Sequence, residues 1–250
     1  MCLIVFAWRP GHALPLLVAA NRDEFYARPA AALAPWDDVP GLVAGRDLQA
    51  GGTWLGLGAN GRFAALTNVR DPGSPAGSAS RGELVTGYLS GTDMPSSFID
   101  TLAPRLGEFS GFNLLLGAPG ELWHFNPHEQ AARQLGEGVY GLSNASLDTP
   151  WPKLRRARQA LAERLQAPYD EEALLALLAD RNRPEDHELP QTGIGLDGER
   201  LLSSVFIESA AYGTRASTLV CLHRDGRRLI RERRFGPHGE PQGETRLELR

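Results

Sequence analysis

The chain has 250 residues, with 42% hydrophobic and 22% charged side chains, which is enough apolar material for one packed domain over residues 1–250. This composition excludes disordered, collagen-like and coiled-coil proteins. The formal net charge of -4 provides no overall attraction to nucleic acid or to an anionic membrane, so neither partner is expected.

Extended apolar runs separated by turn residues predict a strand meander in the first third of the chain. The expected strands cover residues 2–8, 14–20, 42–44, 53–57 and 62–67. Asn60-Gly61 lies between the last two, and it predicts a hairpin because both residues tolerate positive φ. The following stretch, 71–80, is rich in Gly, Ser and Pro and is expected to form a surface loop or a flexible lid.

The rest of the chain is predicted to contain a block of helices with strands on both sides. Helices are expected over 82–89, 95–106, 152–165 and 171–180, and strands over 112–116, 122–125 and 139–142. After a polar loop over 181–198, strands are expected over 202–208, 217–223, 228–235 and 245–249. Because strands and helices do not alternate regularly, the predicted fold is an antiparallel α+β sandwich.

The chain has only two cysteines, Cys2 and Cys221. It shows no charged leader with a cleavage site and no apolar run of about 18 residues or more. These features predict a cytoplasmic protein without a membrane span, in which two free thiols are favoured over a disulfide. No cofactor or metal is expected, because the six histidines are scattered and no phosphate-binding Gly-Lys-Ser/Thr motif occurs.

Cys2 is the most informative candidate for chemistry. Removal of the initiator methionine tolerates a small second residue, and it would expose an α-amine beside the thiol. These two groups ordinarily titrate near about pH 8 and 8.5, so one residue would supply both a nucleophile and a base. The alternative is that Cys2 is a small hydrophobic residue opening a buried strand. A retained Met1 would block the amine and exclude amine-assisted catalysis.

Several polar strings accompany Cys2 along the chain. They are Asn21-Arg22-Asp23-Glu24, Gly-Gly-Thr-Trp-Leu-Gly at 51–56, Thr-Asn-Val-Arg at 67–70, Ser143-Asn144 and Gly-Thr-Arg-Ala-Ser-Thr at 213–218. Together they make the chain resemble the NRDE family, which includes transport and Golgi organisation protein homologues. The resemblance covers nearly the full length.

More distantly, the chain resembles N-terminal nucleophile (Ntn) amidases of the choloylglycine hydrolase and penicillin V acylase type. This resemblance implies a four-layer αββα sandwich. It also implies a set of catalytic residues. Cys2 would be the nucleophile, and Arg22 and Asp23 would hold it. Asn68 and Asn144 would be oxyanion or amine ligands, and Arg215 would be the late arginine of the site.

The implied arrangement is physically coherent. Arg22 and Arg215 would favour the thiolate of Cys2, while Asp23 would orient the α-amine. The two asparagine side chains would then serve the oxyanion.

The alternative is that the same residues have purely structural roles. Asn68 and Asn144 stand at apparent strand ends, where asparagine commonly caps turns, and Arg215 has Glu208 as a possible ion-pair partner. The amidases separate their Arg and Asp by two residues, whereas here the two are adjacent. Asn21 or Glu24 is therefore an alternative for one of these roles.

Two functions follow from these residues. The first is a Cys2-dependent hydrolase of a linear amide, with an acyl-enzyme on Cys2 that water hydrolyses. The second is carriage of a hydrophobic cargo, haem or a lipid-derived group of the acyl-CoA type, because NRDE relatives are associated with haem and lipid homeostasis. The fold alone does not decide between them.

Overall fold

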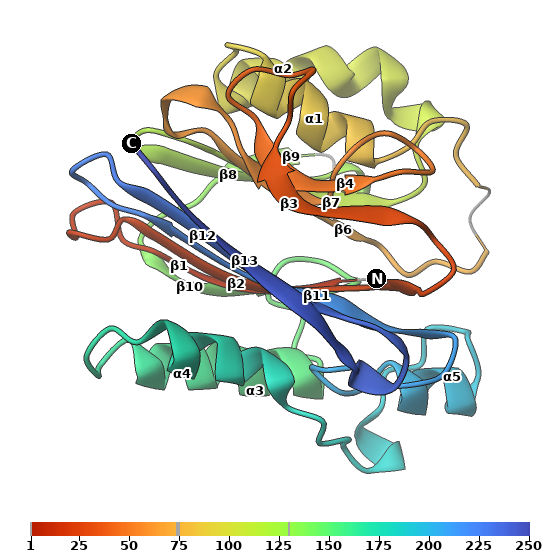
Figure 1. The fold of residues 1–250 in the computed structure, drawn as a ribbon. Coiled ribbons are helices and arrows are strands. Elements are labelled where there is room, and N and C mark those ends of the chain that lie inside the picture. The colour runs from red at the N-terminus through yellow and green to blue at the C-terminus, as the bar shows by residue number, and fades with distance from the viewer. Residues whose placement is uncertain (1, 74–75, 130) are drawn as a thin grey trace.

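A computed structural model describes residues 2–73, 76–129 and 131–250 as two antiparallel sheets packed face to face (Figure 1). The six-stranded sheet has the order β10-β1-β2-β11-β12-β13, and the seven-stranded sheet runs in order from β3 to β9. The strands are β1 Cys2–Trp8, β2 Leu16–Phe25, β3 Ala30–Pro35, β4 Val43–Asp47, β5 Leu55–Leu57, β6 Phe63–Asn68, β7 Phe112–Ala118, β8 Glu121–Asn126, β9 Ala131–Gln134, β10 Gly138–Leu142, β11 Tyr212–Leu222, β12 Arg228–Phe235 and β13 Pro241–Leu249.

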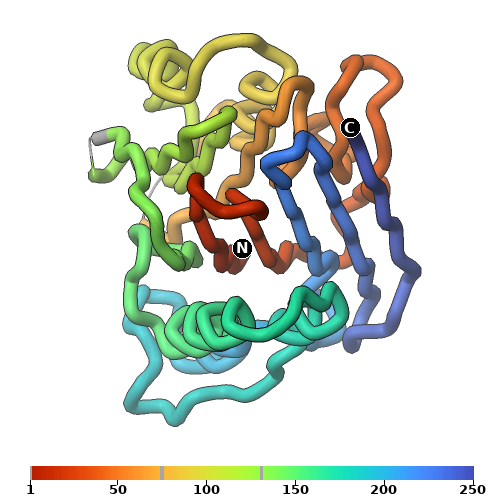
Figure 2. The backbone as a smooth tube through the Cα atoms, turned by 90° about the vertical axis from the view of Figure 1, so that its left-hand side faces the viewer, coloured from red at the N-terminus to blue at the C-terminus, as the bar shows by residue number. Residues whose placement is uncertain are grey.

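The helices cover the outer faces of the two sheets. They are α1 Gly82–Ser90, α2 Pro95–Leu102, α3 Pro152–Arg164, α4 Glu171–Ala176 and α5 Leu196–Leu201. Figure 2, turned by 90°, shows α1 and α2 on one side of the sandwich and α3 and α4 on the other. Within the described ranges, none of the helices has the length and apolar content needed to cross a bilayer.

Three apolar clusters hold these layers together. One lies between the sheets and includes Phe6 and Leu115, and a second, around Tyr88, joins the seven-stranded sheet to α1 and α2. The third, around Leu161, joins the six-stranded sheet to α3 and α4. The result is the four-layer αββα sandwich that the sequence predicts.

β1 is buried along its whole length because it lies inside two of these clusters at once. Ile4 and Phe6 belong to the cluster between the sheets, while Leu3 and Val5 belong to the cluster under the helices. Side chains alternate between the two faces of a strand, so an uninterrupted apolar run is what a strand buried on both faces requires. By the same alternation, Cys2 is on the face of Ile4, toward the opposite sheet.

The turn residues form as the sequence predicts. Asn60 and Gly61 have φ of 56° and 75° between β5 and β6, and Gly226 has φ of 88° between β11 and β12. The predicted helix over 95–106 is shorter, because α2 ends at Leu102 and continues as a 3₁₀ turn, Ala103–Glu108. Pro104 lacks the N–H that a continued α-helix would need. The described part of the predicted loop 71–80 contains no helix or strand, and its residues 74 and 75 lie outside the described ranges.

The strand predicted over 202–208 is wrong. The segment is buried at Val205 and Ile207, but it forms no strand ladder: its backbone has one backbone bond to β11, from the Thr214 N–H to the Ile207 carbonyl at 2.8 Å, and is otherwise held by side chains of β2 and β11. Asn21 Nδ2 donates to the carbonyls of Val205 and Leu178, at 2.9 and 2.8 Å, and the Ile207 N–H donates to Thr214 Oγ1 at 2.9 Å. The segment is therefore held by specific side-chain bonds in the helical layer.

Sequence reasoning also missed several short elements. β3 buries only Leu33 and contains a terminal proline, and β9 has four residues; both are edge strands of the seven-stranded sheet. The predicted polar loop over 181–198 contains a 3₁₀ turn, Asp186–Glu188, and the beginning of α5. Elements this short carry too few residues for a clear apolar period.

The bonds of Asn21 give a prediction for stability. Replacing Asn21 by Leu removes both amide donors and leaves two buried carbonyls without these bonds. We expect the free energy of unfolding to fall by about 2 to 4 kcal/mol, measured by urea unfolding. Asn182→Leu is the matched control, because Asn182 is exposed, and it should change stability by less than about 0.5 kcal/mol. Equal stability of the two variants would mean that Asn21 does not anchor this segment.

Candidate active site

Cys2 lies at the beginning of β1, between the strands β2 and β10. In the ladder with β2 it is paired with Arg22. On the other side, just beyond β10, Ser143 Oγ donates to the Cys2 carbonyl oxygen at 3.5 Å. The residue is only 7% exposed, and Cys2 and Cys221 are both free thiols.

The alternation of β2 distributes the Asn21-Arg22-Asp23 string over two faces of the sheet. The Arg22 guanidinium carbon lies 4.2 Å from the centre of the Trp54 ring, and both residues line a small cavity together with Cys2. On the helix face, Asp23 Oδ1 accepts a hydrogen bond from Thr214 Oγ1 at 2.7 Å. Adjacent residues on a strand point to opposite faces. Arg22 and Asp23 thus approach the beginning of β1 from different sides.

The cavity beside Cys2 is very small. It leaves about 10 Å³ for the centre of a water molecule, which is room for about one water. Larger cavities of about 540, 530 and 830 Å³ are lined by other residues. In this form of the chain the thiol is therefore enclosed.

Burial sets the protonation of the Cys2 thiol. Loss of hydration raises the pKa of Cys2, and the negative charge of Asp23 raises it further. The positive charge of Arg22 and a hydrogen bond from the Asp23 backbone act in the opposite direction. Because burial dominates, the thiol is the resting form, and nucleophilic attack requires a base.

The Gly-Gly-Thr-Trp-Leu-Gly run supports Trp54, which lies beneath Arg22. At Gly45, on the neighbouring strand β4, a Cβ atom would lie 2.5 Å from a carbon of the Trp54 ring. At Gly52 a Cβ atom would lie 2.5 Å from the carbonyl carbon of Gly82, at the beginning of α1. Only glycine permits these approaches. The run is thus explained by the packing that holds Trp54 under Arg22.

The structure brings Asn68 and Asn144 together. Asn144 Nδ2 donates to the Asn68 carbonyl oxygen at 2.8 Å, and the Arg70 N–H donates to the Asn144 carbonyl oxygen at 2.8 Å. Ser143, which contacts the Cys2 carbonyl, also lies 3.4 Å from Asn144 Oδ1. The two predicted asparagines therefore share one corner with Cys2, at the ends of β6 and β10.

A buried polar network holds this corner from the side of the seven-stranded sheet. Asn113 Nδ2 donates to Thr67 Oγ1 at 3.0 Å and to the Ala145 carbonyl at 2.8 Å. Asn113 Oδ1 accepts from Asn126 Nδ2 at 3.0 Å and lies 3.1 Å from His124 Nε2. Burial lowers the pKa of His124 to about 4, so the imidazole is neutral at pH 7. The network fixes the backbone that follows Asn144.

Arg215 is held at the turn between β2 and β3. It lies at a bulge between Thr214 and Ala216, and its guanidinium donates to the carbonyls of Phe25, at 3.2 Å, and Arg28. Its alternative partner, Glu208, forms an ion pair with Arg181 at 2.7 Å instead. Burial lowers the pKa of Arg215, and the positive charge of Arg22 adds to this effect. Its described hydrogen bonds thus connect Arg215 to a turn rather than to Cys2.

Lys153 is a member of the site that sequence reasoning missed. It is the only lysine among 26 cationic residues, follows Pro152 at the beginning of α3, and is 2% exposed. Its Nζ donates to the Leu202 carbonyl oxygen at 2.9 Å. Burial lowers the pKa of Lys153 to about 8, while the negative charges of Asp23 and Cys2 act in the opposite direction. The signal in the sequence was the residue type itself, since lysine can release a proton near neutral pH and arginine cannot.

Two further arginines belong to the surroundings of Cys2. Arg81, at the beginning of α1, donates to the Gly111 carbonyl at 3.2 Å; burial lowers its pKa, and the charge of Cys2 opposes this effect. Arg70, two residues after β6, forms a buried ion pair with Glu199 of α5 at 2.7 Å. Arg81 thus adds a positive charge near Cys2, whereas the charge of Arg70 is neutralised by Glu199.

Comparison with known sequences now identifies the family. Residues 1–237 match the sequence model described as Transport and Golgi organisation 2. The chain belongs to this family. It is 35% identical to the human Transport and Golgi organization protein 2 homolog, over 98% of this chain and 97% of the relative. The Drosophila melanogaster Transport and Golgi organization protein 2 is 29% identical, over 96% and 95% of the two chains.

Two solved structures of hydrolases have a similar fold. A Caenorhabditis elegans N-acylethanolamine-hydrolyzing acid amidase ortholog aligns with a TM-score of 0.53 and 12% identity, over 87% of this chain and 92% of the other. A mutant conjugated bile acid hydrolase from Clostridium perfringens aligns with a TM-score of 0.58 and 7% identity, over 100% and 92%. At these identities the likeness concerns the fold. The fold expected from the resemblance to amidases is thus confirmed, and the expected likeness to transport and Golgi organisation protein homologues is confirmed by the family match.

The buried amine of Lys153 gives a prediction of pH dependence. Its folded pKa, about 8, is below the ordinary value of 10.5, so the unfolded chain binds more protons between these two values. The stability of the parent relative to Lys153→Met should therefore rise across this window, by about 3 kcal/mol in total. Urea unfolding of both proteins from pH 7.5 to pH 10.5 measures the difference.

A matched control separates burial from the simple loss of a charge. Arg155 lies on the same helix with its side chain 61% exposed. The stability difference between the parent and Arg155→Met should stay constant over the same pH range. A constant difference for Lys153→Met as well would contradict a depressed pKa.

Proposed function

We propose that the chain, after removal of Met1, is a cysteine amidohydrolase of the Ntn type that cleaves a linear amide. One observation carries the proposal. Cys2 opens a central, doubly buried strand, opposite Arg22 and beside Ser143-Asn144, in a chain with the fold of known amidases. An N-terminal nucleophile requires a small nucleophilic residue at this position.

In the proposed reaction, the α-amine of Cys2 accepts the thiol proton as Sγ attacks the amide carbon. A C–S bond forms and the carbonyl oxygen becomes an oxyanion. The C–N bond then breaks as the α-ammonium donates its proton to the leaving amine, which leaves a thioester on Cys2. Water, deprotonated by the same amine, attacks the thioester, so that a carboxylic acid departs and Sγ regains a proton. The raised pKa of the buried thiol fits a mechanism in which a base removes the proton during attack.

The neighbours of Cys2 would contribute through charge and hydrogen bonds. Arg22 favours the developing thiolate. One amide hydrogen of Asn144 is used by the Asn68 carbonyl, which leaves the second for an oxyanion, a donor worth about 3 kcal/mol in a transition state. Asp23 and Lys153 lie on the helix face and would set the charge around the amine.

The substrate class follows from the structural relatives. An amidase that hydrolyses N-acylethanolamines and a hydrolase of conjugated bile acids share this fold, so we propose an N-acyl amide as the substrate. The cavity at Cys2 admits about one water, so the proposal requires that it open when the substrate binds. We propose the cytoplasm as the compartment in which Met1 is removed. Haem or an acyl cargo is the second candidate function, and it would need the same opening of the cavity.

The first prediction concerns the N-terminus. Protein made in a bacterial cytosol should lack Met1, because cysteine is small enough for initiator removal, and intact-mass spectrometry measures this directly. Protein that retains Met1 in full would lack the free α-amine, and the proposed mechanism would be excluded.

The second prediction concerns covalent labelling. An electrophilic amide or β-lactone probe should acylate the parent, and Cys2→Ala should abolish the labelling without changing the circular dichroism spectrum. Cys221→Ala is the matched control and should label like the parent, because Cys221 is fully buried and burial raises its pKa to about 12. Labelling that survives in Cys2→Ala would contradict the assignment of the nucleophile. Saturable haem binding without any labelling would favour the cargo function.

A further inference from the structure

The Gly-Thr-Arg-Ala-Ser-Thr string lies in β11, where the strand pairs with β2. In the ladder between the two strands, Thr214 is paired with Asp23, and Ala216 is paired with Arg22. Two steps along β11 therefore correspond to one step along β2. The residue between the two pairs, Arg215, is the extra residue of a β-bulge.

The bulge determines which side chains of β11 face the helices. Side chains alternate along a regular strand, so Thr214 and Ser217, three positions apart, would point to opposite faces. The extra residue puts both on the helix face. There Ser217 Oγ donates to Asn21 Oδ1 at 2.6 Å, and Thr214 Oγ1 donates to Asp23 Oδ1 at 2.7 Å. Without the bulge, the hydroxyl group of Thr214 would face the opposite sheet.

Arg215 holds the bulge in place. Its guanidinium donates to the carbonyls of Phe25, at 3.2 Å, and of Arg28, around the turn that follows β2. Bulges are over-represented next to active sites, where they re-aim a side chain. The late arginine of the site thus has a role that requires no contact with Cys2.

The hydroxyl group of Thr214 has a fixed donor direction. Thr214 is fully buried, and its Oγ1 accepts the Ile207 N–H at 2.9 Å. A hydroxyl group has a single proton to donate, and this proton is directed at Asp23 Oδ1. A hydrogen bond to the charged form of a carboxyl group favours that form. Thr214 therefore favours the ionised form of Asp23 and fixes the rotation of its carboxyl group.

Several charged and titratable groups act on Asp23 from the elements around it. They are Cys2 of β1, Arg22 of β2, Tyr26 after β2, Lys153 of α3 and Tyr212 of β11. Burial raises the pKa of Asp23, whereas the positive charge of Lys153 and the hydrogen bond from Thr214 act in the opposite direction. The hydroxyl group of Thr214 is thus one of the groups that oppose protonation of this buried carboxylate.

We propose that Thr214 is a positioning residue of the site, whose hydroxyl group holds the Asp23 carboxylate in the orientation that receives the α-amine of Cys2. The inference rests on the proposed function, in which this amine takes the thiol proton during attack. The negative charge of Asp23 stabilises the α-ammonium that forms. Thr214 acts through Asp23 and not by contact with the reacting atoms.

Carbon-13 NMR of the Asp23 carboxyl group in the full-length protein measures the first consequence. The signal is assigned by its absence in Asp23→Asn. Thr214→Val removes the hydroxyl group and keeps the shape of the side chain, so the midpoint of the Asp23 titration should move to higher pH by about 1 to 2 units. Thr214→Ser keeps the hydroxyl group and should titrate like the parent.

The rate at which the β-lactone probe labels Cys2 measures the second consequence. Protonation of Asp23 removes the charge that stabilises the α-ammonium, so labelling should slow toward low pH. In Thr214→Val this decline should begin at a pH about 1 to 2 units higher than in the parent, and Thr214→Ser should restore the parental profile. A purely structural role of Thr214 would lower the rate without moving the profile along the pH scale.

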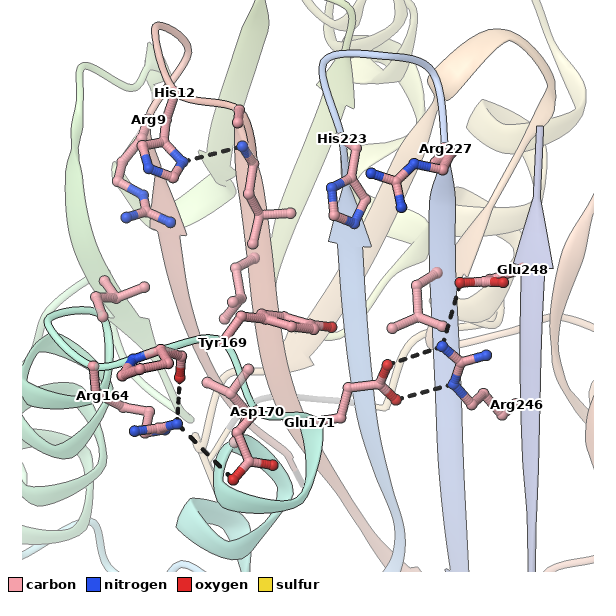
Figure 3. A pocket seen from close by; sticks show the side chains of 18 residues that line it. Arg9, His12, Arg164, Tyr169, Asp170, Glu171, His223, Arg227, Arg246 and Glu248 are labelled. Carbon is pink, nitrogen blue, oxygen red and sulfur yellow. Dashed lines mark hydrogen bonds and ion pairs between the residues drawn. The ribbon is translucent and has the colours of Figure 1, made fainter.

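The opposite end of the six-stranded sheet provides a matched control. There Arg9, Tyr169 and Arg246 line the cavity of about 540 Å³, between the β1–β2 and β11–β12 turns (Figure 3). The Tyr169 hydroxyl lies 3.4 Å from Cys221 Sγ of β11, roughly 20 Å along the strand from Thr214. Tyr169→Phe therefore removes a hydroxyl group from the same face of β11, and its titration and labelling profiles should remain those of the parent.

Two results with Thr214→Val would overturn the proposal. The first is an Asp23 titration with the same midpoint as in the parent. The second is a shifted titration with an unchanged labelling profile. If Thr214→Val does not fold, Arg215→Met is the second variant, because it keeps Thr214 and removes the bonds that hold the bulge. The Asp23 midpoint should again move to higher pH, and an unmoved midpoint would contradict the proposal.

The two measurements also separate this inference from the proposed function. A parent protein that the probe leaves unlabelled would contradict the hydrolase function. The NMR titration would still decide whether Thr214 controls the ionisation of Asp23, because it requires no reaction at Cys2.

Discussion

The register of β2 between β1 and β11 decides which side chains meet at Cys2. In that register Arg22 is paired with Cys2 on one side and with Ala216 on the other. A slip of one residue would turn Arg22 toward the helices and Asp23 toward the opposite sheet. Asn21 prevents such a slip, because its side chain is bonded to two carbonyls in the helical layer and accepts from Ser217 at 2.6 Å. Asn21, which precedes Arg22 in the sequence, therefore affects the site by fixing the register of β2.

The register of β2 also explains why several ionisable groups are buried near the beginning of β1. Taking Lys153, Asp23 and Arg22 out of water costs free energy that an apolar packing would not cost. Their hydration is replaced by a few specific partners, namely the Leu202 carbonyl, Thr214 and the face of Trp54. Groups with pKa values displaced in both directions cluster at functional sites more often than elsewhere. This is the physical ground for our proposal that the chemistry occurs at the beginning of β1.

The sequence predicted what local patterns encode. The apolar run of β1, the Asn60-Gly61 turn and the spacing within α3 are local, and each formed as expected. Asn68 and Asn144 were found through motifs that stand at strand ends, and the structure brings them together. Lys153 was missed because its contact with Leu202 joins residues 49 positions apart, and no local pattern marks such a contact. Residues 202–208 failed for the same reason, since side chains of distant strands take the bonds that a strand partner would take.

The large cavity and the groups with displaced pKa values lie at opposite ends of the six-stranded sheet. At Cys2 the cavity holds about one water, yet the thiol, the carboxylate and the lysine around it all have displaced pKa values. At Arg9 the cavity is large, and the arginines Arg164, Arg227 and Arg246 on its walls are paired with carboxylates. Volume alone would favour the second end as the reactive centre. Chemistry requires groups that can exchange protons with a bound molecule, and arginine holds its proton throughout the physiological range. The first end is therefore better suited to reaction than the second.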